Sequence, residues 1–263
     1  MNVIVINPPL VQLNTVYPAG AYLSAYFRQQ NCNVVWHDLS IRLFYSIFSR
    51  QGLTKLFKHS SQNAIKLADN ALSNGDEATS FNLRRYVATQ QSWINWIDFI
   101  TESLRGGGQE KAHQFLYSPY APRGNRMENY LADISSQNRE PNVDDIRFLC
   151  TLALADLADY ITAVFDPNFS LIRYAEALTV NESSFAQIEN QIDSPVMEHF
   201  YKPVLEEVFG GESLPLAPTA SGVFRYPFQR GQKFFYRVAP ATPPKLCKKL
   251  TNTYYYIWII FLY

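Results

Sequence analysis

The chain has 263 residues, of which 47% are hydrophobic, 15% aromatic and 17% charged, and this composition excludes a disordered, collagen-like or low-complexity chain. Its 23 basic and 23 acidic residues cancel, so no overall positive field predicts a nucleic-acid partner. The three cysteines, Cys32, Cys150 and Cys247, form neither a disulfide framework nor a metal motif, which predicts a reduced, cytoplasmic setting.

The first 38 residues have the pattern of a strand, a helix and a second strand. Residues 2–6 (NVIVI) are a β-branched run that favours a buried strand. After a loop from Asn7 to Tyr17, Pro18 suits the first turn of a helix whose apolar residues recur every three or four positions. A second apolar run at 34–36 ends at His37 and Asp38. This order predicts a βαβ unit.

The middle of the chain, residues 49–209, is predicted to be mainly helical. A helix over 40–57 is expected to break near Gly52, and another to end at a loop around 74–76. Trp93 lies in a helical pattern over 81–104 that the glycines at 106–108 end, and it indicates core packing more than a ligand wall. The clearest helix covers 144–165, with Cys150 on its apolar stripe. Ser183 and Ser184 suggest a short helix, and 195–209 another.

The last segment, residues 210–263, differs in charge from the rest. It holds seven Lys or Arg residues and one acid, Glu212, with six prolines that break any long element. One interpretation is a basic-aromatic arm that binds an anionic partner. The other is an irregular tail translated in a shifted frame, which the composition favours. Its apolar end at 254–263 is shorter than the roughly 20 residues that cross a bilayer, so no membrane partner is predicted.

The loop after the first strand is the candidate site. Open α/β sheets bind ligands at the carboxyl ends of their strands, beside a helix N-terminus that favours anions. The alternative is an ordinary connection, with Asp38 capping the helix that begins near Ser40. No pair of histidines has metal-ligand spacing, and His37 is interpreted as a surface residue. The candidate binding residues are Asn7, Pro8, Pro9, Tyr17, Pro18, Gly20 and Asp38.

The order of these residues along the chain resembles the N-terminal sequence of a known protein family. A strand followed by Pro8-Pro9, the sequence Tyr17-Pro18-Ala19-Gly20-Ala21-Tyr22-Leu23, and a second strand before Asp38 are similar to the N-terminal region of radical S-adenosylmethionine (radical SAM) proteins that carry a cobalamin-binding-like domain. The resemblance covers residues 2–48, is looser to about 209 and does not cover the tail. It implies a Rossmann-like start and cobalamin as a possible cofactor.

Two family motifs are missing. The CxxxCxxC motif that binds the 4Fe-4S cluster of these enzymes is absent, as is the DxHxxG motif of histidine-ligated cobalamin. The resemblance therefore implies that S-adenosylmethionine and the cluster belong to an intact family member with a radical SAM barrel, which would act on an unknown substrate. This chain is expected to have no catalytic residue, no metal site and no activity alone.

The sequence thus predicts an α/β fold with a Rossmann-like βαβ start over 1–48, a long, mainly helical region over 49–209, and an irregular tail over 210–263. The predicted function is the cobalamin-binding-like front part of a radical SAM enzyme. The alternative is a helical interaction protein whose basic-aromatic arm binds an anionic partner.

Overall fold

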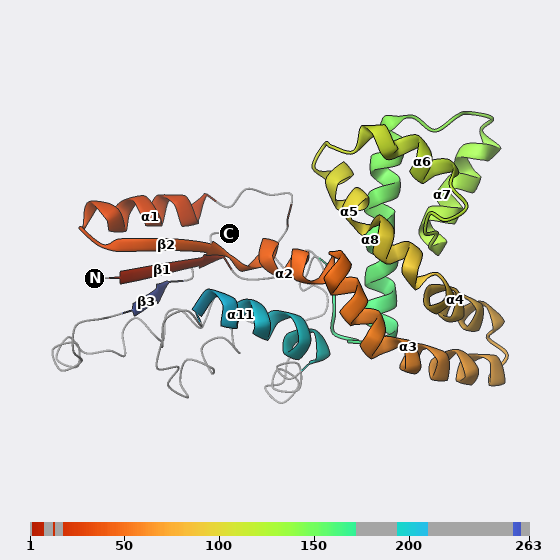
Figure 1. The fold of residues 1–263 in the computed structure, drawn as a ribbon, viewed down its shortest axis with the longest axis horizontal. Helices are drawn as coiled ribbons and strands as arrows, with labels where there is room; N and C mark the ends of the chain where they lie inside the picture. Colours follow the sequence, from red (N-terminus) through yellow and green to blue (C-terminus); the bar gives the residue numbers. More distant parts are fainter. Residues whose placement is uncertain (1, 8–12, 14–17, 172–193, 210–254, 259–263) are drawn as a thin grey trace. The chain divides into compact units, whose positions relative to one another are not determined.

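The computed structural model is mostly helical, with a small parallel sheet that includes the N-terminal strands (Figure 1). It describes residues 2–7, 13, 18–171, 194–209 and 255–258. The chain divides into two compact units, which are Met1–Phe44 with Ile172–Tyr263, and Tyr45–Leu171. The predicted division instead placed its boundaries at residues 48 and 209. No helix in the described part of the chain is both long enough and apolar enough to cross a membrane.

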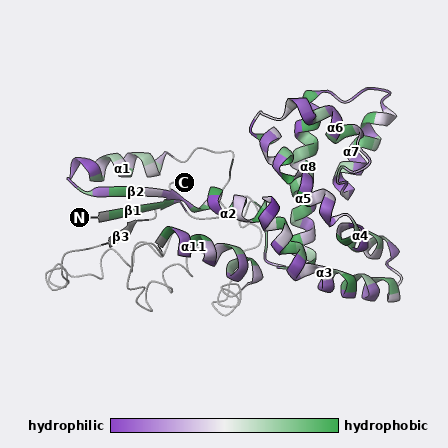
Figure 2. Cartoon of the chain, viewed as in Figure 1, coloured by the Kyte–Doolittle hydropathy of each residue, from purple (hydrophilic) through white to green (hydrophobic). Residues whose placement is uncertain are grey.

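The βαβ prediction is confirmed at the level of the elements. Strand β1 (Asn2–Asn7) and strand β2 (Asn33–Asp38) are parallel and joined by helix α1 (Ala19–Gln29), whose N-cap residue is Pro18. Figure 2 shows that β1 is hydrophobic along most of its length, as expected for a strand buried in a parallel sheet. The small core between α1 and the two strands consists of Val3, Val5 and Val34, with Leu23, Phe27 and Cys32 packed against it.

A third strand comes from the far end of the chain. Strand β3 (Tyr255–Trp258) pairs in parallel with β1, so the sheet order is β2-β1-β3. The prediction of an irregular tail over 210–263 is therefore wrong for these four residues. The periodicity failed here because four apolar residues are too few to distinguish a strand from a helix or a loop. The other residues of the tail lie outside the described part.

Helix α2 (Leu39–Ile47) follows β2 directly, and the boundary between the two units falls within it. Later in the chain, the π-helical turn η2 (Met197–Tyr201) runs into α11 (Lys202–Phe209), which confirms the helix predicted at 195–209. Arg42 of α2 forms an ion pair with Glu207 of α11 at 2.9 Å. The short helix predicted at Ser183 and Ser184 lies outside the described residues.

The second unit is built from helices. These are α3 (Arg50–Ser73), α4 (Glu77–Ala88), α5 (Gln90–Leu104), the 3₁₀ turn η1 (Gln109–Lys111), α6 (Ala112–Tyr117), α7 (Asn125–Ser136) and α8 (Val143–Val164). Hydrophobic and hydrophilic residues alternate along them (Figure 2), the pattern of helices that bury one face. Gly106 and Gly108 adopt positive φ angles of 90° and 71° after α5, which confirms the predicted helix stop.

Helix α8 provides much of the core of this unit. Its N-cap residue Asn142 and Asp145 form a capping box, in which each side chain accepts the other's backbone N–H. Cys150 is fully buried, as predicted, and burial raises the pKa of its thiol to about 12. Trp93 is also fully buried and stacks on Tyr86 with ring centroids 5.6 Å apart, which confirms the packing interpretation.

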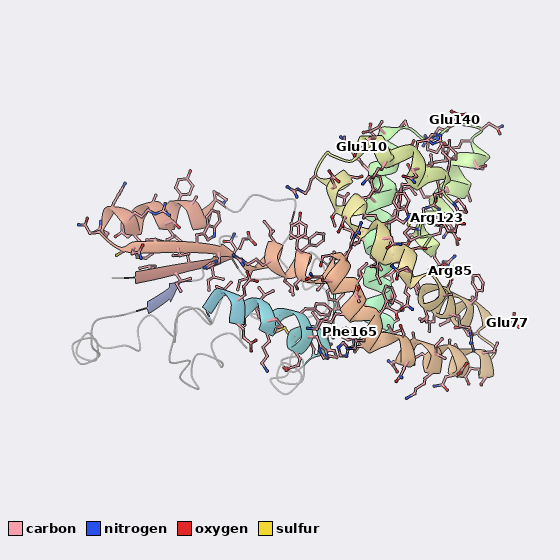
Figure 3. The ribbon with its side chains drawn as sticks, viewed as in Figure 1. Glu77, Arg85, Glu110, Arg123, Glu140 and Phe165 are labelled. Carbon is pink, nitrogen blue, oxygen red and sulfur yellow. The ribbon has the colours of Figure 1, made fainter. Side chains whose placement is uncertain are left out.

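Polar contacts connect helices at the surface of this unit. Arg85 of α4, labelled in Figure 3, forms an ion pair with Glu128 and donates a hydrogen bond to Asn125, both at the start of α7. Arg123 donates hydrogen bonds to the backbone oxygens of Phe115 and Leu116, at 3.0 and 2.7 Å, so it fixes the end of α6. Both α6 and α7 belong to the stretch 49–209 that the sequence predicts to be mainly helical.

Two helix breaks differ from the predicted ones. The break predicted near Gly52 occurs at Phe48 and Ser49, because the extended backbone of Ser49 begins α3 and its hydroxyl accepts the N–H of Gly52 at 3.1 Å. Gly52 has a different role: a Cβ atom there would lie 2.2 Å from the backbone oxygen of Ile47. The single helix predicted over 81–104 is broken at Thr89 into α4 and α5.

We expect the substitution Gly52→Ala to lower the free energy of unfolding by about 2 kcal/mol, because the added methyl group must displace backbone at the α2–α3 junction. Urea denaturation measures the change. Gln51→Ala, at the exposed neighbouring position of α3, is the control and should change stability by no more than about 0.5 kcal/mol. Equal effects of the two substitutions would contradict the proposed close approach.

Candidate functional site

The candidate site lies where β1 and β2 end. In the parallel register Asn7 is opposite Asp38, and the side-chain Nδ2 of Asn7 donates a hydrogen bond to Asp38 Oδ2 at 2.9 Å. Asn7 is 5% exposed, so this contact satisfies a buried amide group. Two of the predicted site residues, 31 positions apart in the sequence, are therefore brought into direct contact at the carboxyl edge of the sheet.

Asp38 has a second partner. Its Oδ1 accepts the backbone N–H of Ile41 at 3.0 Å, which caps the first turn of α2. The capping interpretation of Asp38 is therefore confirmed, and it holds together with the contact to Asn7. A carboxylate can accept about four hydrogen bonds, so both oxygens of Asp38 retain capacity for a ligand's hydroxyl or amino groups.

Gly20 is buried in the first turn of α1 because the indole ring of Trp36 covers it. A Cβ atom at Gly20 would lie 2.4 Å from Cε2 and Nε1 of that ring. Residues 36 and 38 lie on the same face of β2, since side chains alternate along a strand. Trp36 was not among the predicted site residues. Its position two residues before Asp38 in a predicted strand could have identified it, because such residues share a face.

The N-terminus of α1 completes the arrangement. Pro18 makes no side-chain capping hydrogen bond, and the first turn contains no acidic residue, so the positive end of the helix dipole is not neutralised locally. Ser24, one turn after Gly20 on the same face, is 3% exposed, and its hydroxyl has no hydrogen-bond partner among the described residues. Of the remaining predicted residues, Pro8, Pro9 and Tyr17 lie outside the described residues.

His37 belongs to the other face of β2. Burial and the nearby Arg42 lower the pKa of its imidazole below the ordinary value, and Glu207 opposes this shift. The ring is therefore mainly neutral at pH 7. Because alternation directs it away from the face of Asn7 and Asp38, His37 supplies no ligand or proton to the candidate site.

The donor sets required by the implied cofactors are not assembled in the described residues. Cys150 is buried in the core of the helical unit, Cys32 is half-buried in the other unit, and Cys247 lies outside the described part. No group of three His, Cys, Asp or Glu side chains among the described residues has the geometry of a metal site. The described residues therefore do not fit a 4Fe-4S cluster, and the position of His37 does not fit histidine-ligated cobalamin.

Chemically, the arrangement is suited to binding. It combines a carboxylate with spare acceptor capacity, a buried amide and a helix N-terminus without a side-chain cap, and its described residues include no nucleophile paired with a base. Comparison with known proteins gives no match: no family model fits the chain, and no curated protein or solved structure matches it significantly.

Proposed function

We propose that this chain is the cytoplasmic, N-terminal cobalamin-binding-like part of a radical SAM enzyme and has no catalytic activity by itself. The observation that carries the proposal is the Asn7–Asp38 hydrogen bond at the carboxyl edge of the parallel strands β1 and β2. Together with the buried Gly20 under Trp36, it supports a Rossmann-like start with a ligand loop at the usual edge of the sheet.

In this proposal Asn7, Asp38, Pro18 and Gly20 form one wall of a binding or domain-contact surface, and Pro8, Pro9 and Tyr17 belong to the loop beside it. Any cobalamin bound there is held without a histidine ligand from β2. S-adenosylmethionine and the iron–sulfur cluster belong to the radical SAM barrel of the intact enzyme, which is the intramolecular partner that we propose for this part. The Lys and Arg residues of the tail lie outside the described part of the chain, so the alternative of a basic arm stays a prediction.

The first test reads the gene. We expect another reading frame downstream of the Gly210 codon to encode alternating strand and helix patterns and a CxxxCxxC motif. If no other frame is open, the tail is the natural end of this product, and the assignment to a radical SAM enzyme fails.

The second test measures cofactor binding by the full chain. We expect hydroxocobalamin to change its visible spectrum on titration, with weaker binding after Asp38→Ala, because that variant removes the carboxylate at the strand ends. The control is Asp69→Ala, a carboxylate of the helical unit that pairs with Arg84. An unchanged spectrum at saturating protein would exclude cobalamin binding by this chain, and equal weakening by both variants would exclude the role of Asp38.

A further inference from the structure

Strand β2 lies at one edge of the sheet that the described residues form. In the order β2-β1-β3 it pairs with β1 alone, so the backbone groups on its other side have no strand partner among these residues. Natural proteins protect such edges with lysine, proline, a bulge or a covering element. The sequence of β2, NVVWHD, contains neither lysine nor proline, and the strand pairs with β1 residue by residue without a bulge.

Apolar side chains are exposed on both faces of β2. Val35 is 46% exposed and Trp36 is 42% exposed, and consecutive residues of a strand point to opposite faces. Val34, by contrast, is 7% exposed because it packs in the small core under α1. Strands inside a parallel sheet are apolar on both faces. Residues 34–36 have that composition, although β2 lies at the edge of the described sheet.

The sequence of β2 is complementary to itself in one antiparallel register. Two copies related by a two-fold axis perpendicular to the sheet meet in antiparallel orientation, and residues opposite each other then share a face. With Val35 on the axis, Val34 lies opposite Trp36 of the second copy. Asn33 lies opposite His37, whose imidazole is mainly neutral at pH 7. Apolar residues thus meet apolar ones, and polar residues meet polar ones.

The neighbouring registers are less favourable. With Trp36 on the axis, the carboxylate of Asp38 lies opposite the apolar side chain of Val34, whereas in the register centred on Val35 it lies beyond the overlap. A register centred on Val34 overlaps only residues 33–35. We propose that two copies of this chain associate through their β2 edges, antiparallel and centred on Val35, so that two three-stranded sheets become one.

Sedimentation velocity of the full chain over about 1 to 100 µM tests the proposal. We expect a monomer that converts to a dimer as the concentration rises, and nothing larger, because a two-fold interface is closed. Val35→Lys places like charges opposite each other and should raise the dimer dissociation constant at least about tenfold. Val143→Lys is the matched control, since Val143 is 48% exposed on α8 in the helical unit, and it should change that constant less than about twofold.

A mixture of two variants tests the register. Val35→Glu alone should be as monomeric as Val35→Lys, but an equimolar mixture of the two should form a mixed dimer, because opposite charges then meet on the axis. Mixing does not rescue a variant that fails to fold, and circular dichroism checks that each variant keeps the helix content of the parent chain. A parent chain that stays monomeric or forms larger species would overturn the proposal. Equal effects of the two lysine variants, or the absence of a mixed dimer, would overturn it as well.

Discussion

Replacing Asp156 by alanine is expected to lower the free energy of unfolding by about 3 kcal/mol, the largest effect of any single substitution that we propose. Asp156 lies on α8 and is 1% exposed. Its carboxylate accepts the backbone N–H of Arg126 at 3.0 Å and that of Met127 at 3.2 Å. Both amides belong to the first turn of α7, whose N-cap residue is a glycine without a side chain. The alanine variant leaves both amides without this acceptor, and the amide of Met127 is buried.

Asp159 provides the control, one helical turn further along α8. Its side chain is 57% exposed and pairs with Arg126, which is 52% exposed, and such surface pairs contribute at most about 1 kcal/mol. Urea denaturation of Asp156→Ala and Asp159→Ala therefore separates a buried cap from a surface ion pair. Similar losses in the two variants would contradict the capping role.

The contribution of Asp156 to the stability of the protein is expected to depend on pH, and the direction follows from its pKa. Burial raises the pKa of Asp156, despite the two backbone hydrogen bonds that favour its charged form. The native state therefore binds a proton more readily than the unfolded state, so the contribution of this group falls as the pH rises from about 4 through the raised pKa. The stability of the parent chain relative to Asp156→Asn should fall over the same interval.

Gly20→Ala is expected to destabilise the β1-α1-β2 region by about 2 kcal/mol. Alanine improves the intrinsic stability of a helix by up to about 1 kcal/mol, but the added Cβ would lie 2.4 Å from the indole ring of Trp36. The overlap forces the ring from its position or moves α1 from the sheet. Equilibrium denaturation and amide hydrogen exchange of β1 measure the loss.

Whether Gly20→Ala lowers or raises the stability depends on the residue at position 36. In a chain that carries Trp36→Ala, the overlap is removed and Gly20→Ala should stabilise the protein through helix propensity alone. Ala25→Gly, at an exposed position of α1, calibrates that propensity without a packing change. A destabilising Gly20→Ala in the Trp36→Ala background would refute the close contact as the cause.

Local patterns predicted the elements that depend on local signals. The β-branched run of β1, the proline at the start of α1 and the apolar stripe of α8 each identify an element within a few residues. The sequence also placed Asn7 and Asp38 near the strand ends, but their direct contact depends on the parallel register of β1 and β2, which the sequence did not predict.

Other features depend on residues that are distant in sequence. The start of α7 is capped by Asp156, about 30 positions downstream, so no local cap marks that helix. Thr89 ends α4 without a glycine or proline, and the break between α2 and α3 depends on the conformation of Ser49. At the candidate site, the cover that Trp36 places over Gly20 is a packing contact between strand and helix that periodicity alone does not reveal.

The division of the chain has a consequence for the order of folding. The helical unit is one continuous segment of the sequence, residues 45–171. The other unit consists of the residues that precede this segment and the residues that follow it. During synthesis, the helices can pack as soon as that run has emerged, because the run contains all the residues of that unit. The sheet has to wait for β3, whose pairing with β1 closes a loop of most of the chain length. The strands β1 and β2 are thus synthesised first, but the sheet that contains them is completed last.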